Sequence, residues 1–203
     1  IQFDIDDVDG DGVKEIVGAT RFGYLYVFNG VSHAEEWRSS YLEGDLHGLA
    51  IDDVDGDGTK EIVVGGGSGH IYVFDGVTHV LEWISDNQGG WIGWIQGLSI
   101  YDIDHDGTKE IIAGLMTGEG MPAYGVGYIY VYDGVTCELE ALSDPVDQWI
   151  GMSGISISDV DDDGQEELVT GGSGHVCILR LPKPPSPVES LEKLVQTIKS
   201  WTL

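Results

Sequence analysis

Sixteen carboxylates of this 203-residue chain fall in one nine-residue pattern, Asp-x-Asp-x-Asp-Gly-x-x-Glu, which occurs four times. The copies run from Asp7 to Glu15, Asp53 to Glu61, Asp102 to Glu110 and Asp159 to Glu167. Carboxylates at alternate positions converge when the backbone curls around a point, and the glycine permits the sharp turn. Several charged oxygens on a flexible loop are the ligand set that Ca²⁺ prefers. The pattern therefore predicts up to four calcium ions, one for each copy.

These loops differ from EF-hands. An EF-hand glutamate follows the glycine by six residues and leads into a helix. Here the glutamate follows by three residues and opens a short β-branched run that glycine ends, such as residues 61–65, which indicates a strand. The alternative is an acidic surface turn without an ion. That alternative crowds four carboxylates together, and a like-charged pair costs about 4 kcal/mol at 4 Å in an effective dielectric of 20.

The segments around the loops repeat with periods of 46, 49 and 57 residues. A short strand precedes each loop, at residues 3–6, 49–52, 98–101 and 155–158, and a second strand follows it. A third strand alternates aromatic residues at 24–28, 70–74 and 128–132, and an Asn-Gly or Asp-Gly pair then signals a hairpin into a fourth strand. Four antiparallel strands in about 45 residues describe a β-propeller blade. We expect an all-β chain, a β-propeller of four recognisable four-stranded blades.

The fourth repeat is incomplete, because no hairpin or fourth strand follows the strand that ends at Arg180. We expect propeller repeats over residues 1–181, divided at about 1–47, 48–96, 97–153 and 154–181, then a Pro-rich linker at 182–187 and an amphipathic helix at 188–203. The helix either packs against the propeller or contacts a partner. The chain also begins inside a repeat, which favours a piece of a longer protein. The blades either close as a four-bladed ring or form part of a larger ring that a second copy or a further propeller segment completes.

The formal net charge is −27, and four calcium ions would reduce it only to −19. A protein this acidic is not expected to bind nucleic acid, which needs a basic patch. No apolar run is long enough to span a membrane. The two cysteines, Cys137 and Cys177, are too few for a disulfide framework and are expected to be free thiols.

The acidic loop, followed by the strand Gly-x-Ile-Tyr-Val-Phe-Asp-Gly at residues 69–76, resembles the FG-GAP/VCBS repeats, the calcium-loop blades of integrin α-chain propellers and of many microbial surface proteins. The resemblance covers residues 1 to about 181. It implies that the aspartates and the glutamate are side-chain ligands and that the seventh loop residue offers its carbonyl. The implied metal ligands are Asp7, Asp9, Asp11, Val13, Glu15, Asp53, Asp55, Asp57, Thr59, Glu61, Asp102, Asp104, Asp106, Thr108, Glu110, Asp159, Asp161, Asp163, Gln165 and Glu167. The last ligand is often Asp in the family, and the longer Glu of this chain is expected to reach.

The same strand, with a tryptophan further on, also resembles the repeat of pyrroloquinoline-quinone dehydrogenases. In that family the tryptophan packs between neighbouring blades. This resemblance implies only a packing role, for Trp37 and Trp83. Nothing in the chain resembles the quinone pocket.

Strand direction sorts the loops onto two faces. The acidic loops and the Asn/Asp-Gly hairpins share one face, and the turns between second and third strands share the other with the connections between repeats. This second face collects aromatic residues, and the third repeat has an insertion of about nine residues there, between Gly114 and Gly127. The candidate ligand-binding residues are Tyr41, Trp91, Trp94, Tyr124 and Trp149. The alternative is that these aromatic side chains plug the hub and cover the blade junctions.

The leading functional hypothesis is a calcium-stabilised β-propeller, extracellular or at the cell surface, that binds a protein or glycan on the face opposite the acidic loops. Calcium sites of extracellular modules have Kd values of about 10⁻⁴–10⁻³ M and are empty in the cytosol, which supports that location. No catalytic residues are predicted. The alternatives are a polysaccharide-lyase-type propeller enzyme, for which Arg21 is the basic candidate, and a structural spacer without a ligand of its own.

Overall fold

The computed structural model describes residues 2–87, 93–117, 126–146, 154–172 and 176–180, which form fifteen strands in four antiparallel sheets. Blade 1 contains β1 (Gln2–Asp6), β2 (Glu15–Ala19), β3 (Leu25–Asn29) and β4 (Glu35–Arg38). Blade 2 contains β5 (Leu46–Asp52), β6 (Glu61–Gly66), β7 (Ile71–Asp75) and β8 (Leu81–Ile84). Blade 3 contains β9 (Gly93–Tyr101), β10 (Glu110–Thr117), β11 (Val126–Asp133) and β12 (Leu139–Leu142). Blade 4 contains β13 (Ile155–Ser158), β14 (Glu167–Gly171) and β15 (Val176–Arg180).

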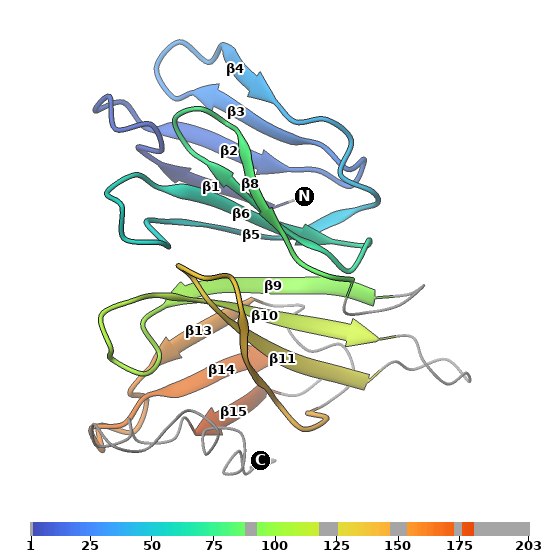
Figure 1. Ribbon diagram of the computed structural model, residues 1–203, viewed down its shortest axis with the longest axis vertical. Coiled ribbons are helices and arrows are strands. Elements are labelled where there is room, and N and C mark those ends of the chain that lie inside the picture. Colours follow the sequence, from blue (N-terminus) through green and yellow to red (C-terminus); the bar gives the residue numbers. More distant parts are fainter. Residues whose placement is uncertain (1, 88–92, 118–125, 147–153, 173–175, 181–203) are drawn as a thin grey trace.

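Within each sheet the strands are hydrogen-bonded in sequence order, so every blade is an antiparallel meander. The predicted all-β architecture is confirmed. The blades stand in a row, with blade 1 at the top and blade 4 at the bottom of Figure 1, and the first strands β1, β5, β9 and β13 contact one another in succession. Blades 1 and 4 therefore occupy opposite ends of an open array.

The described residues contain no helix with the length and apolar character needed to cross a bilayer. The linker and helix expected at 182–203 lie outside the described residues.

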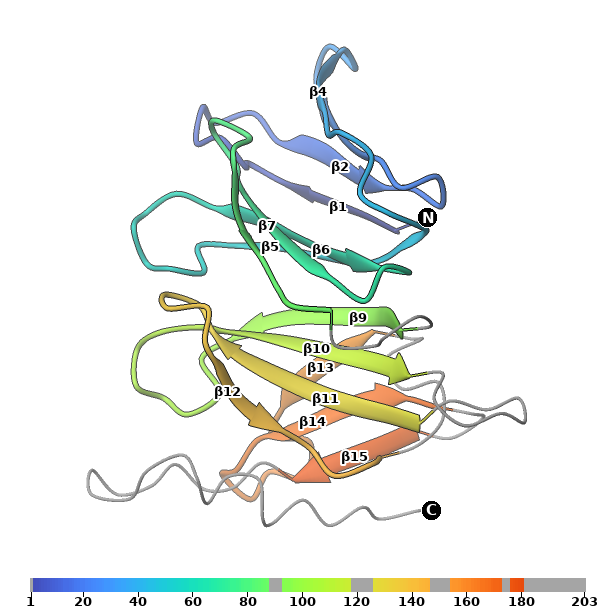
Figure 2. The ribbon, with the colours of Figure 1, turned by 45° about the vertical axis from the view of Figure 1, so that its right-hand side comes forward.

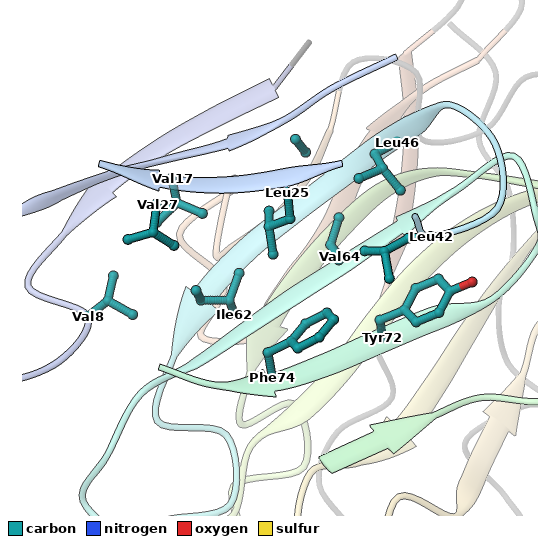
Figure 3. Close-up of a cluster of buried hydrophobic side chains, with 11 residues drawn as sticks. Val8, Val17, Leu25, Val27, Leu42, Leu46, Ile62, Val64, Tyr72 and Phe74 are labelled. Carbon is teal, nitrogen blue, oxygen red and sulfur yellow. The ribbon is translucent and has the colours of Figure 1, made fainter. Parts of the chain in front are cut away.

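The hydrophobic core lies between the blades. Alternate residues of a strand point to opposite faces of the sheet, so each blade has one apolar face toward the preceding blade and one toward the following blade. Three buried clusters result, one at each junction. Figure 3 shows the first, in which Val17, Leu25 and Val27 of blade 1 lie opposite Ile62 and Phe74 of blade 2.

Tryptophans of the fourth strands complete two of these junctions. The ring of Trp37 in β4 meets Phe74 of blade 2 edge-on, with centroids 5.4 Å apart, and also stacks on His79 at 4.8 Å. Trp83 in β8 meets Tyr132 of blade 3 in the same way at 5.3 Å. The packing role expected for both tryptophans is confirmed.

A polar link that the sequence did not suggest also joins successive blades. In loops 2, 3 and 4 the eighth residue contacts the residue just before the acidic loop of the preceding blade. Lys60 pairs with Asp6, the Lys109 Nζ atom lies 2.6 Å from Asp52 Oδ1, and the Tyr101 hydroxyl donates to Glu166. At the third junction Tyr101 takes the place of the aspartate and Glu166 takes the place of the lysine, so a polar contact is retained.

The Asn-Gly and Asp-Gly hairpins form as predicted. Glycine is usually favoured in such turns because it adopts a left-handed backbone, but the glycines of these hairpins are required for close packing instead. The left-handed residues of these hairpins are His33, His79 and Cys137, with φ of 57–58°. The glycines Gly30, Gly76 and Gly134 instead press against the acidic loops, where an added Cβ would lie 2.2–2.4 Å from the carbonyl oxygen of the loop lysine. Each hairpin is therefore packed tightly onto the acidic loop of its own blade.

Candidate metal centre

The acidic loops connect the first and second strands of each blade and gather along one edge of the array, at the left of Figures 1 and 2. The sixth loop residue is a glycine in the left-handed region in every copy, with φ of 84–98° at Gly12, Gly58, Gly107 and Gly164. The fourth loop residue is left-handed as well, including the non-glycine residues His105 and Asp162. This double reversal curls the backbone around one point, as the position of the glycines predicts.

The closing glutamate is the most buried member of each loop. Glu15, Glu61, Glu110 and Glu167 are 1–2% exposed. Each begins the second strand, and its Oε2 accepts a hydrogen bond of 2.7–3.1 Å from the backbone N–H of the second loop residue. The carboxylate is thereby held inside the curl of the loop.

The structure brings a carboxylate trio together in every copy, each trio with one oxygen per residue within 4.8 Å of the others. In loops 1, 3 and 4 the trio is formed by the aspartates at loop positions 1 and 3 and the closing glutamate: Asp7, Asp9 and Glu15; Asp102, Asp104 and Glu110; Asp159, Asp161 and Glu167. In loop 2 it is formed by Asp53, Asp55 and Asp57. Oxygens that bind one Ca²⁺ at 2.3–2.6 Å lie no more than about 5 Å apart, so each trio has the spacing of a ligand set.

The fifth loop position has a second role. Asp11, Asp57, Asp106 and Asp163 each accept a hydrogen bond from the backbone N–H of the seventh loop residue: Val13, Thr59, Thr108 and Gln165, at 2.7–2.9 Å. In loops 1, 3 and 4 these aspartates stand outside the trio, as Glu61 does in loop 2. The structure therefore places the predicted side-chain ligands around each loop, with three of them in closest approach.

Unpartnered buried oxygens show that these loops fit a cation. Glu15 Oε1 and Asp7 Oδ1 in loop 1, Asp102 Oδ1 in loop 3 and Glu167 Oε1 in loop 4 are buried without a hydrogen-bond donor. Burial without a donor is costly for a charged oxygen. Desolvation accordingly raises the pKa of Glu15, and raises that of Glu61 to about 7 and that of Glu110 to about 8. A divalent cation would satisfy these oxygens and restore their charged form.

Each of the first three loops has a further carboxylate nearby that the sequence analysis did not include. Glu36, Glu82 and Glu140 of the fourth strands lie close enough to contribute to the raised pKa of Glu15, Glu61 and Glu110, respectively. Burial raises the pKa of Glu140 itself to about 7. A signal was present, because each residue precedes the equivalent positions Trp37, Trp83 and Ala141 in its repeat.

Loop 4 differs because a cationic side chain enters it. Arg180, at the end of β15, is paired in the strand ladder with Glu167, where the other blades have Asn29, Asp75 and Asp133. An Arg180 guanidinium nitrogen lies 2.7 Å from Asp161 Oδ2 and 3.2 Å from Asp163 Oδ2, and its Nε lies 3.5 Å from Glu167 Oε1. Three predicted metal ligands of this loop are therefore neutralised from within the chain.

The opposite face contains part of the predicted ligand-binding group. Tyr41 is 58% exposed, and its ring lies 5.9 Å from that of Tyr24. Trp94 in β9 is half-buried, with its ring 6.4 Å from that of His47. The other three predicted residues, Trp91, Tyr124 and Trp149, lie outside the described residues.

The turn between β2 and β3 adds a residue that the sequence analysis missed. Phe22 is 80% exposed in this turn, beside Gly23, against which the Tyr41 ring packs. Arg21 in the same turn forms an ion pair with Asp45 at 3.2 Å. Phe22 stands where blade 2 has the serine Ser68, and an aromatic residue in place of a small turn residue was the available signal.

Comparison with known proteins supports the repeat and the fold. Residues 53–113 match the model of the FG-GAP-like repeat. No curated protein sequence matches the chain. Among solved structures, the computationally designed Ika4 protein is similar over 83% of this chain and 86% of its own, with a TM-score of 0.58 and 15% identity.

Natural proteins of similar structure are about twice as long. Saccharomyces cerevisiae Sqt1 aligns with 98% of this chain and 47% of its own, with a TM-score of 0.63 and 12% identity. The Dos1 propeller aligns with 93% of this chain and 44% of its own, with a TM-score of 0.61 and 10% identity. The chain thus spans about half the length of these natural proteins.

Proposed function

Since this chain contains an FG-GAP-like repeat and folds as an array of β-propeller blades, we propose that it is a calcium-stabilised, extracellular binding module. Its partner is a protein or glycan that docks on the face opposite the acidic loops. The observation that carries the calcium assignment is the closing glutamate, which is buried in all four loops and whose Oε1 has no partner in loop 1.

The ion class follows from the donors. Every member of each trio is a carboxylate, which is a hard oxygen ligand, and no cysteine or histidine belongs to any trio. Such a set suits Ca²⁺, which accepts six to eight oxygens in flexible geometry, better than the softer transition metals. Sites of this kind in extracellular modules have Kd values of about 10⁻⁴–10⁻³ M, which supports a location where calcium is millimolar.

Loop 4 is expected to bind calcium more weakly than the other loops, because Arg180 must leave before an ion can enter. Calorimetric titration of the full chain should resolve three similar sites and one weaker site. Arg180→Ala should tighten that weakest site about three- to ten-fold, since it removes a competing positive charge at a half-exposed position. Arg21→Ala is the matched control, because Arg21 pairs with Asp45 away from the loops and its loss should leave the titration unchanged. A weakest site unaltered by Arg180→Ala would contradict this assignment.

A non-catalytic role is part of the proposal. A lyase-type site needs a free basic residue, and the candidate Arg21 is bound to Asp45. Exposed aromatic side chains beside it, Phe22 and Tyr41, instead suit stacking on a sugar ring or packing into a partner protein.

The binding role is tested by substituting these aromatics. The full chain, labelled and presented in calcium to a glycan array and to a panel of extracellular proteins, should bind a defined subset. Phe22→Ala and Tyr41→Ala should each weaken that binding at least five-fold, as expected for central aromatic contacts. Val31→Ala is the control, since Val31 is 76% exposed in the β3–β4 hairpin on the acidic-loop face. Equal losses for all three variants, or no binding to any probe, would contradict the proposed face.

A further inference from the structure

The outer face of blade 4 has the composition of a blade junction but lacks a neighbour among the described residues. Four positions form the face that each blade turns toward the next: the second loop residue, one residue of the second strand and two of the third. In blades 1 to 3 all twelve residues at these positions are at most 6% exposed: Val8, Val17, Leu25 and Val27; Val54, Val63, Ile71 and Val73; Ile103, Ile112, Ile129 and Val131. The blade 4 equivalents are Val160, Val169, Val176 and Ile178, of which Val160 is 52% and Val176 63% exposed.

The outer face of blade 1 is also exposed. It corresponds to the face that each other blade turns toward the preceding blade. Phe3 and Ile5 of β1 are 70% and 49% exposed, whereas their equivalents in the other blades belong to the junction clusters: Leu49 and Ile51, Leu98 and Ile100, Ile155 and Ile157. The stacked rings of Tyr26 and Phe28 are half-buried, whereas Tyr72, Phe74, Tyr130 and Tyr132 are at most 6% exposed. Blade 1 thus exposes the face that, in the other blades, packs against the preceding blade.

The two open faces match in the same sense as the three internal junctions. At the first two, a valine- and isoleucine-rich face packs on a face of the following blade that contains aromatic residues, and at the third it packs on leucine and isoleucine side chains of blade 4. A hollow of about 290 Å³ on blade 4, lined by residues that include Ser156, Val169 and Val176, leaves room for side chains of another blade. The occupant that fits either end is therefore another blade of this kind.

We propose that this occupant is a second copy of the chain. The outer face of blade 4 in one copy packs on the outer face of blade 1 in the other, and the reverse contact closes a two-fold ring. The array covers 47% and 44% of the natural proteins that it resembles, so two arrays supply the length of one such protein. A head-to-tail contact that closes in this way gives a finite assembly instead of a filament.

The lysine–aspartate ion pair of the first two internal junctions would be altered at the contact between copies. The loop lysine of blade 1, Lys14, makes no ion pair within the described part of the chain. In the ring it would face Ser158, which stands where blades 1 and 2 have Asp6 and Asp52. The junction between copies would have a hydroxyl in place of a carboxylate, and it would be weaker than the junctions within a copy.

Light scattering on the full chain in calcium should give a mass of twice 21.9 kDa at micromolar concentration. Gly18→Arg should reduce that mass to one copy. Its equivalents Val64 and Ala113 are buried in junctions, but a side chain at Gly18 meets nothing within 4 Å in the single copy. Val176→Asp should have the same effect from the other face. Both variants should keep the β-sheet circular dichroism spectrum, because neither side chain is needed inside one copy.

Val31→Asp is the matched control, since it adds a charge at an exposed valine of the acidic-loop face and should leave the dimer intact. A gain-of-function variant completes the set. Ser158→Asp restores the acidic partner of Lys14 and should tighten the dimer about two- to five-fold for each junction. A monomer for the unmodified chain would overturn the proposal, as would a dimer that survives Gly18→Arg and Val176→Asp or is not tightened by Ser158→Asp.

Discussion

Chelation of divalent cations is expected to lower the melting temperature of this protein by roughly 10 °C. A site with Kd near 10⁻⁴–10⁻³ M contributes about 0.4–1.4 kcal/mol at millimolar calcium. Three or four such sites together contribute a few kcal/mol, and a chain of this size changes its melting temperature by about 2–4 °C per kcal/mol. Without the ions, buried carboxylate oxygens such as Glu15 Oε1 and Asp102 Oδ1 have no donor that satisfies them.

The effect should depend on pH with a defined sign. The folded-state pKa of Glu61 is raised to about 7 and that of Glu110 to about 8, whereas unfolded glutamates titrate near 4.5. Between these values the folded chelated protein binds more protons than the unfolded chain, so its stability falls as pH rises from about 4.5 to 8. Calcium binds the ionised carboxylates, so the difference between loaded and chelated samples should be larger at pH 8 than at pH 5.5.

Differential scanning calorimetry in EDTA, in calcium and in EDTA already saturated with calcium measures this effect and controls for the chelator itself. Identical melting curves in all three solutions would contradict the calcium assignment. A chelation effect that is larger at pH 5.5 than at pH 8 would contradict the role given to the buried glutamates.

Gly134→Ala is expected to destabilise the protein by about 3 kcal/mol. An added Cβ would lie 2.3 Å from the Lys109 carbonyl oxygen and 2.6 Å from that of Val54. Both obstacles are backbone atoms, Lys109 in loop 3 and Val54 in loop 2 of the preceding blade, so neither can rotate away. The hairpin must shift, and the 2.9 Å hydrogen bond from Gly134 N–H to Lys109 is then lost.

Two readouts separate this effect from a general loss of packing. Thermal unfolding measures the destabilisation, and a calcium titration should show weaker binding in the two loops that the hairpin touches. Gly18→Ala is the matched control, because a Cβ at Gly18 meets no atom within 4 Å and blade 3 has Ala113 at the same position. A Gly134→Ala protein as stable as Gly18→Ala would show that the hairpin adapts.

The spacing of the acidic loops was sufficient to predict the all-β fold. A loop that returns on itself must be followed by an antiparallel strand, and the aromatic alternation of residues 70–74 marked the third strand. The carboxylate trios could also be predicted, because Asp7, Asp9 and their equivalents are near in sequence and their convergence depends only on local backbone geometry.

Contacts between segments that are distant in the sequence could not be predicted from the sequence. Arg180 lies seventeen residues beyond Asp163, and only the register of β14 with β15 brings it over loop 4. The pairing of Lys60 with Asp6 spans 54 residues and depends on how neighbouring sheets pack. The tight hairpin glycines were recognised, but a sequence cannot show which backbone approaches Gly76 or Gly134, so their role was attributed to turn geometry.

The location of the hydrophobic core between blades also sets how this protein comes apart. Each inner blade is held by two junctions, whereas blades 1 and 4 are each held by one within a single copy. The free energy of the array is then a sum over nearest neighbours, as in a one-dimensional chain of coupled units. Opening therefore starts at the ends, and the two end blades exchange their amide hydrogens well before blades 2 and 3.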